Sequence, residues 1–196
     1  MNNISLKCKC GTVKGSVSHA SPQVGNHVVC YCGDCQAFAN FLSEDDSILD
    51  EWGGTEIYQT PPWYVTIDSG SEQIRCLRLT PKGIYRWYTG CCNTPIGNTG
   101  SAKFPFVGLI HSFMDKDGET ESTLGPVVGY HKLESAIGEP SEDIQQTGMS
   151  KGTTAQVFWR LLKWKLTSRN KPNLFFDQSG RCISKPEIIN ESPDQG

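Results

Sequence analysis

The sequence lacks any run of about 20 apolar residues, the length that a helix needs to cross a bilayer. Residues 1–9 also lack the apolar core of a signal peptide. Positive charge is not in excess either, because 18 Lys and Arg stand against 21 Asp and Glu and leave a net charge of −3. The chain as a whole therefore has no field that attracts nucleic acid or anionic lipid. We expect a soluble cytoplasmic protein without a membrane partner, and we do not expect nucleic acid as its partner.

Apolar residues are also scarce, at 37% of the chain, whereas 20 Gly and 11 Pro favour turns. Between residues 5 and 110, short apolar runs such as 74–79 and 84–88 are separated by Gly, Pro and Asp, a pattern typical of short strands. One helix is predicted around Asp34–Leu42, where Phe38 and Leu42 are four residues apart, and a longer amphipathic helix is predicted over about 154–168. Its apolar residues are Val157, Phe158, Leu161, Leu162 and Trp164. The sequence thus predicts a mainly β fold with an α-containing extension at the C-terminal end.

Nine cysteines are present, and seven of them lie in three tight clusters. The clustered residues are Cys8, Cys10, Cys30, Cys32, Cys35, Cys91 and Cys92. Structural disulfides are disfavoured, because the number is odd and a cytosol keeps thiols reduced. Closely spaced thiols in an intracellular chain indicate a metal instead, and soft thiolates select zinc or iron–sulfur clusters over magnesium or calcium. Cys76 and Cys182 have no neighbours of their kind and are interpreted as packing or surface thiols.

The middle cluster has the spacing Cys30-x-Cys32-x-x-Cys35, and Gly33 allows the bend that lets three thiolates converge on one ion. Three protein ligands leave one coordination position open, as in catalytic zinc sites. His27 upstream and Asp34 within the motif are candidates for closing that position. A redox pair of Cys32 and Cys35 is the competing interpretation, but the βαβ context of such motifs is missing.

Charge narrows the chemistry of this middle cluster. Zn²⁺ held by three thiolates has a formal charge of 2 − 3 = −1, so it is a weaker Lewis acid than a zinc with neutral ligands. Such a centre favours binding and ionising a substrate thiol over hydrolysis. The deaminase signature, H-x-E followed by P-C-x-x-C, does not occur. Tyr31 and Asp34 are the candidate acids nearest to this site in the sequence.

The first and last clusters are predicted to form one structural zinc site. Cys8 and Cys10 are followed by Gly11, and Cys91 and Cys92 lie between a Gly and a Pro, so both pairs resemble knuckles at hairpin turns. Adjacent side chains on an extended chain point to opposite sides, which makes Cys91 and Cys92 awkward partners on one ion. Which of these two is a ligand is left open by the spacing alone.

Together these motifs resemble the family of glutathione-dependent formaldehyde-activating enzymes, which includes centromere protein V domains. The matching motifs, in order, are Cys8-x-Cys10-Gly, Cys30-x-Cys32-x-x-Cys35 and Cys92-Asn93-Thr94-Pro95. The resemblance extends from Leu6 to about Ile96. It implies a zinc-containing fold called a β-tent, glutathione as the thiol and formaldehyde as the electrophile.

The resemblance also implies roles for the cysteines. The structural zinc would be held by Cys8, Cys10 and Cys92, and the catalytic zinc by Cys30, Cys32 and Cys35. The chain departs from the family where the last motif should read C-x-x-C-G, because Thr89 occupies the first Cys position and Asn93 the Gly position. Cys91 is the candidate replacement ligand.

Two hypotheses follow from this reading. In the first, residues 1–114 form a zinc-binding β-tent domain with one structural and one catalytic zinc, and the extension 115–196 packs on it. The chain is then an enzyme of the carbon–sulfur lyase type that adds a small thiol to a small carbonyl. In the alternative, the metal is purely architectural, and the basic helix over 154–169 binds a protein or a nucleic acid.

Overall fold

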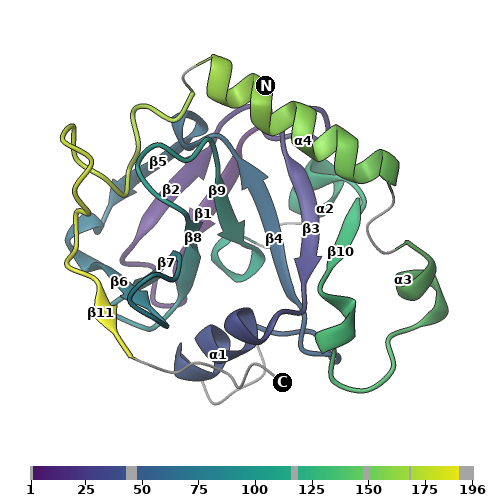
Figure 1. Cartoon of the computed structure of the whole chain (residues 1–196). Coiled ribbons are helices and arrows are strands. Elements are labelled where there is room, and N and C mark those ends of the chain that lie inside the picture. Colours follow the sequence, from purple (N-terminus) through teal and green to yellow (C-terminus); the bar gives the residue numbers. More distant parts are fainter. Residues whose placement is uncertain (1, 43–47, 116–118, 148–150, 168, 190–196) are drawn as a thin grey trace.

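Two β-sheets make up most of the structure, a computed structural model that describes residues 2–42, 48–115, 119–147, 151–167 and 169–189 (Figure 1). The smaller sheet has the strand order β1-β2-β5, and the larger has the order β10-β3-β4-β9-β8-β7-β6-β11. The prediction of a mainly β fold is confirmed.

The smaller sheet consists of β1 (Ile4–Lys7), β2 (Lys14–Val17) and β5 (Val65–Ser69). The larger sheet consists of β3 (Asn26–Cys30), β4 (Thr55–Thr60), β6 (Ile74–Arg78), β7 (Tyr85–Thr89), β8 (Pro95–Thr99), β9 (Val107–Ile110), β10 (Gly129–His131) and β11 (Glu187–Ile188). The helices are α1 (Gly33–Leu42), α2 (Glu119–Leu124), α3 (Glu142–Thr147) and α4 (Lys151–Leu166). No described helix is long and apolar enough to span a bilayer.

Segments after residue 114 complete the larger sheet. The neighbouring strands from β3 to β6 pair antiparallel. At one edge β10 pairs parallel with β3, and at the other edge β11 pairs parallel with β6. Phe175 and Phe176 from the same late region are buried in the main core, where the ring of Phe175 stacks on Trp87 at a centroid distance of 4.6 Å. Both parts of the chain therefore share one sheet and one core.

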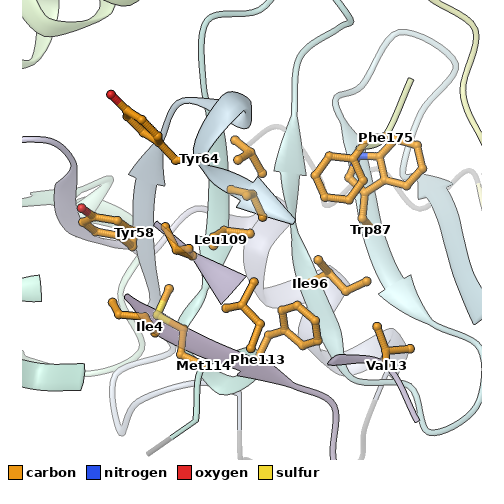
Figure 2. Packing of buried hydrophobic residues seen from close by; sticks show 14 of the residues in the cluster. Ile4, Val13, Tyr58, Tyr64, Trp87, Ile96, Leu109, Phe113, Met114 and Phe175 are labelled. Carbon is orange, nitrogen blue, oxygen red and sulfur yellow. The ribbon is translucent and has the colours of Figure 1, made fainter. Parts of the chain in front are cut away.

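The main core fills the space between the two sheets (Figure 2). Strand alternation explains its composition, since every second residue of a strand faces the partner layer. Ile4 and Leu6 of β1 alternate with exposed residues, and Trp87 and Leu109 approach from the larger sheet. This core supports the smaller sheet on one face of the larger one and leaves the opposite face to α1.

Helix α1 covers that opposite face and forms a second core. Its buried residues are Cys35, Phe38, Ala39 and Leu42, which follow one another at the i, i+3, i+4, i+7 spacing of a single helical face. Phe38 and Leu42 pack with Leu77 and Ile110 of the larger sheet. The helix expected near Asp34–Leu42 is thus present, and its buried face begins with a cluster cysteine.

Helix α4 begins and ends close to the predicted range and extends across the ends of the central strands (Figure 1). Trp164 is buried near Phe106, and the Arg160 guanidinium donates a hydrogen bond to Asn26 Oδ1 at 2.7 Å. The expected apolar stripe does not match the buried face completely, because Phe158 is 62% exposed and its neighbour Trp159 67%. The helix packs through its C-terminal half and leaves an aromatic pair in solvent.

Candidate metal centres

Four cysteine sulfurs converge where the β1–β2 turn meets the β7–β8 turn. The Sγ of Cys8 lies 3.5 Å from that of Cys10 and 3.9 Å from that of Cys91, and Cys10 and Cys91 are 3.4 Å apart. Cys92 Sγ is 3.8 Å from Cys91 Sγ, and all four sulfurs lie within 4.8 Å of one another. Ligands arranged tetrahedrally at about 2.3 Å from one zinc are about 3.8 Å apart. This four-cysteine cluster therefore has the size of a tetrahedral thiolate site.

The backbone explains how adjacent cysteines reach one centre. The Asn93 N–H donates to the Thr89 carbonyl and the Thr89 N–H to the Thr94 carbonyl, so residues 89–94 form a tight turn rather than a strand. Asn93 has a φ of 53°, a left-handed conformation that asparagine tolerates better than most residues. Adjacent side chains point to opposite sides only where the chain is extended. Here the turn brings Cys91 and Cys92 to the same side.

Hydrogen bonds among the four thiols distribute their protons unevenly. Burial raises the pKa of Cys92, but hydrogen bonds from Thr89 and Thr94 lower it to about 5. Burial and hydrogen bonds to Cys10 and Cys92 raise the pKa of Cys91 to about 12. Without a cation the cluster therefore carries a thiolate at neutral pH, while other sulfurs keep their protons. Metal binding must release those protons, which makes the metal affinity depend on pH.

The other three clustered cysteines lie where β3 runs into α1. Cys30 ends the strand, and the Cys32 carbonyl accepts hydrogen bonds from the N–H groups of Cys35 and Gln36 in the first turn of the helix. The sulfurs of Cys30 and Cys32 are 3.4 Å apart, and all three lie within 4.8 Å of one another. The positive end of the helix dipole favours thiolates at this position.

Within this three-cysteine cluster one sulfur is the preferred thiolate. Hydrogen bonds from Cys30 and then Cys35 lower the pKa of Cys32 to about 2. The bond to Cys32 raises the pKa of Cys30 to about 11, and bonds to Cys30 and Cys32 raise that of Cys35. The cluster thus holds a negative charge shared among three soft donors, a set that fits a thiophilic divalent cation such as zinc.

The two candidate fourth ligands, His27 and Asp34, are both bound to other partners. His27 contacts the Gly125 carbonyl through Nδ1 at 2.7 Å and Glu56 through Nε2 at 2.6 Å. The Asp34 carboxylate is ion-paired with Arg86 at 3.4 Å. Among the described residues, the cluster of convergent metal-binding groups at this place consists of the three cysteines alone.

The chain matches a family of unknown function, DUF6151, over residues 1–185. The chain belongs to that family. No curated protein matches the chain. The match extends through both cysteine clusters and most of the late region, so the part of the chain that matches DUF6151 includes the late edge strand β10 and ends just before β11.

Three residues of this DUF6151 chain lie beside the three-cysteine cluster although no motif identified them. Arg86 of β7 is only 1% exposed, and its Nη1 lies 3.8 Å from Cys35 Sγ and 3.4 Å from Asn98 Oδ1. His131 of β10 is the register partner of Cys30. The only sequence signal for Arg86 was its charge within an apolar strand, between Tyr85 and Trp87. That signal does not tell which face of the sheet the arginine occupies.

The sequence candidate Tyr31 lies elsewhere. Its side chain is fully buried, and its hydroxyl donates to Asp50 Oδ2 at 3.0 Å. Burial and then the hydrogen bond to Asp50 raise its pKa well above the ordinary range. Asp34, in contrast, is 48% exposed and stays next to the cluster through Arg86.

Proposed function

We propose that the three-cysteine cluster is the reactive centre of a zinc-dependent enzyme of the carbon–sulfur lyase type. Three converging thiol groups, with no fourth protein ligand among the described residues, support this proposal. Zinc at such a place would supply a soft Lewis acid on which a small thiol is held as thiolate at neutral pH. The sequence resemblance suggests a glutathione-like thiol and a small carbonyl such as formaldehyde.

The proposed reaction is an addition without redox change. A bond forms between the thiol sulfur and the carbonyl carbon, and the π electron pair of the carbonyl moves to its oxygen. That oxygen takes up one proton, which balances the proton that the thiol released. No oxidant or reductant is needed, so the reaction requires only the two substrates and a group that moves the proton.

Asp34 and His131 are the groups we propose for proton movement. Asp34 is half exposed and held beside the centre by Arg86, so it can exchange protons with solvent. His131 stands opposite Cys30 on the neighbouring parallel strand, a position that brings side chains onto the same face of a sheet. Asp34 was already a candidate acid from the sequence, and His131 takes the place of the other candidate, Tyr31, whose hydroxyl is bonded to Asp50.

We further propose that the four-cysteine cluster holds a structural zinc and that the fold is a β-tent. The cluster is able to hold a metal ion, and it connects a turn of the smaller sheet with a turn of the larger one. A zinc there would fix the two sheets relative to each other at the edge of the core. The proposed cellular location is the cytoplasm, where thiols stay reduced.

Cobalt substitution tests the enzyme proposal directly. Glutathione added to the Co²⁺-loaded protein should add a thiolate-to-cobalt charge-transfer band, and formaldehyde should then be consumed. The Cys32→Ser variant keeps the four-cysteine cluster intact and should show neither change. A spectrum that is unchanged by glutathione in the fully loaded wild-type protein would refute the enzyme proposal.

A zinc-stabilised binding module is the second candidate, and one observation favours it. Phe158, Trp159 and Leu166 of α4 are each more than 60% exposed, at 62%, 67% and 76%. Exposed aromatic residues of this kind often mark a contact surface. The module proposal expects every zinc to be saturated by protein ligands, so the same cobalt experiment distinguishes it from the enzyme.

A further inference from the structure

Arg86 is a buried cation whose compensating charge is only partly accounted for by carboxylates. The residue is 1% exposed, and its ion pair with Asp34 spans 3.4 Å to a side chain that is 48% exposed. A guanidinium removed from water needs close counter-charges to be tolerated. Its Nη1 donates toward Cys35 Sγ, which makes the thiolate cluster the second source of negative charge.

Packing around Arg86 keeps water away from the guanidinium. Phe38 lies against it with a ring centroid 5.5 Å from the guanidinium carbon. The gap that Arg86 shares with Thr55, Asn98 and Cys35 is too narrow for a water-sized sphere. The buried Thr55 hydroxyl at this gap has no hydrogen-bond partner among the described residues. Charges in such a dry place are weakly screened and act strongly on their neighbours.

The charge sum of the centre shows what Arg86 changes. A divalent ion with three thiolates has a net charge of −1, and a fourth ligand that is an anion would make the net charge −2. A buried positive charge beside Cys35 cancels one unit and removes most of the repulsion against an incoming anion. Resting on the function proposed above, we propose that Arg86 is a specificity-determining residue that makes the three-cysteine centre prefer a thiolate to a neutral fourth ligand.

Two probes that differ in charge test this preference on the Co²⁺-loaded protein at fixed pH. 2-Mercaptoethanol binds as an anion after its proton leaves to the buffer, whereas imidazole binds as a neutral ligand. In Arg86→Met we expect thiol affinity to fall about tenfold or more, while imidazole affinity changes less than about threefold. Arg86→Lys, which keeps the charge, should retain most of the preference.

The exposed pair of Arg181 and Asp177 supplies the matched control. Its ion pair is 3.0 Å long, but the arginine side chain is 83% exposed. Arg181→Met should leave the affinities for both probes unchanged. If the ratio of thiol to imidazole affinity is unchanged in Arg86→Met, the proposal for Arg86 is overturned while the enzyme proposal stands. An equal loss of both affinities would be one such result, and it would mean that Arg86 is merely structural. Wild-type protein that binds no thiol would overturn both.

Asp34→Asn tests the same idea without disturbing the core, in case Arg86→Met loses metal from the three-cysteine centre. Removing the half-exposed carboxylate leaves the charge of Arg86 uncompensated on that side. The ratio of thiol to imidazole affinity should then rise about two- to threefold, a modest change because solvent screens the carboxylate. A ratio that stays constant or falls would overturn the proposal.

Discussion

The two cysteine clusters use the same ligand type but are assembled in opposite ways. The four-cysteine cluster joins residues 83 positions apart, Cys8 and Cys91, and connects turns of different sheets. The three-cysteine cluster is contained within residues 30–35, at the junction of one strand and one helix. A distant cross-link restrains the unfolded chain far more than a local one does. The difference indicates that one cluster serves the fold and the other is free to serve chemistry.

The surroundings of the two clusters also differ, and they support the same assignment of roles. Threonine hydroxyls contact the four-cysteine cluster at both ends, since Thr12 lies 3.2 Å from the exposed Cys10 Sγ and the buried Thr94 lies 3.2 Å from Cys92 Sγ. The three-cysteine cluster adjoins a buried arginine and a helix N-terminus. Neutral hydroxyls are adequate for fixing thiolates in place, whereas a buried cation changes which further ligand the centre can accept.

The largest effect is expected from breaking the four-cysteine cluster. Cys8→Ser and Cys91→Ser should each release one metal ion and lower the free energy of unfolding by about 3–5 kcal/mol, which corresponds to a fall in Tm of about 10 °C or more. Metal analysis and thermal unfolding by circular dichroism measure both quantities.

The same measurement on Cys92→Ser resolves the pair of adjacent cysteines. If both Cys91 and Cys92 are ligands, the two variants lose similar stability. If Cys91→Ser keeps its metal and its Tm, the cluster has three ligands, and the contrast between the two centres disappears.

Cys32→Ser should have the opposite profile. Loss of the preferred thiolate removes the metal and the thiol binding of the three-cysteine cluster, and activity falls to background. Stability should change by no more than about 2 kcal/mol, because the local cluster cross-links little of the chain. Global unfolding of this variant would show that the middle cluster is structural.

Local spacing explains why much of this could be predicted from the sequence. Metal-ligand spacing within residues 30–35 and the periodicity of Phe38 and Leu42 are short-range signals, and the structure brings these residues together as expected. The position of Arg86 could not be predicted, because its contact with Cys35 spans 51 residues and depends on strand register. The exposure of Phe158 was also missed, since a helical stripe does not reveal which part of it meets another layer.

The turn at residues 89–94 shows where a signal existed but was not used. Asn is one of the few residues that adopts a positive φ readily, and Asn93 stands directly after the adjacent cysteines. Interpreting this segment as a turn would have made Cys91 and Cys92 compatible ligands from the beginning. The pairing of this turn with Cys8 was predicted from the cysteine clusters, and the structure brings the sulfurs together although the two segments belong to different sheets.

The pH dependence of stability tests the role of His27, which lies on the same strand as Cys30. Burial alone lowers the pKa of His27, but the hydrogen bond to Glu56, with the Gly125 carbonyl and the Glu56 charge, raises it above its ordinary value. Both ring nitrogens face acceptors, so both can donate only in the protonated form. The stabilisation is complete below the unfolded pKa of about 6.5 and is lost as pH rises through the higher folded pKa.

His27→Gln should therefore be less stable than the wild type by about 1–2 kcal/mol at pH 5.5 and by less at pH 8.5. Urea unfolding at both pH values measures the difference. Since metal release from thiolates is favoured at low pH in both proteins, the difference between variant and wild type isolates the histidine. A gap that widens with rising pH would contradict the assignment.

The smallest effect is expected at a cysteine outside both clusters. Cys182 is partly buried against the main core, where its backbone pairs with Phe176. Cys182→Ala removes one thiol but little packing, so stability should change by less than about 1 kcal/mol, with full metal content and unchanged thiol binding. Metal analysis alongside the Cys8 and Cys32 variants provides the comparison, because all three variants lose one sulfur. If Cys182→Ala also released metal, metal loss would follow from the loss of any thiol. The assignment of a structural role to one cluster and a chemical role to the other would then have no support.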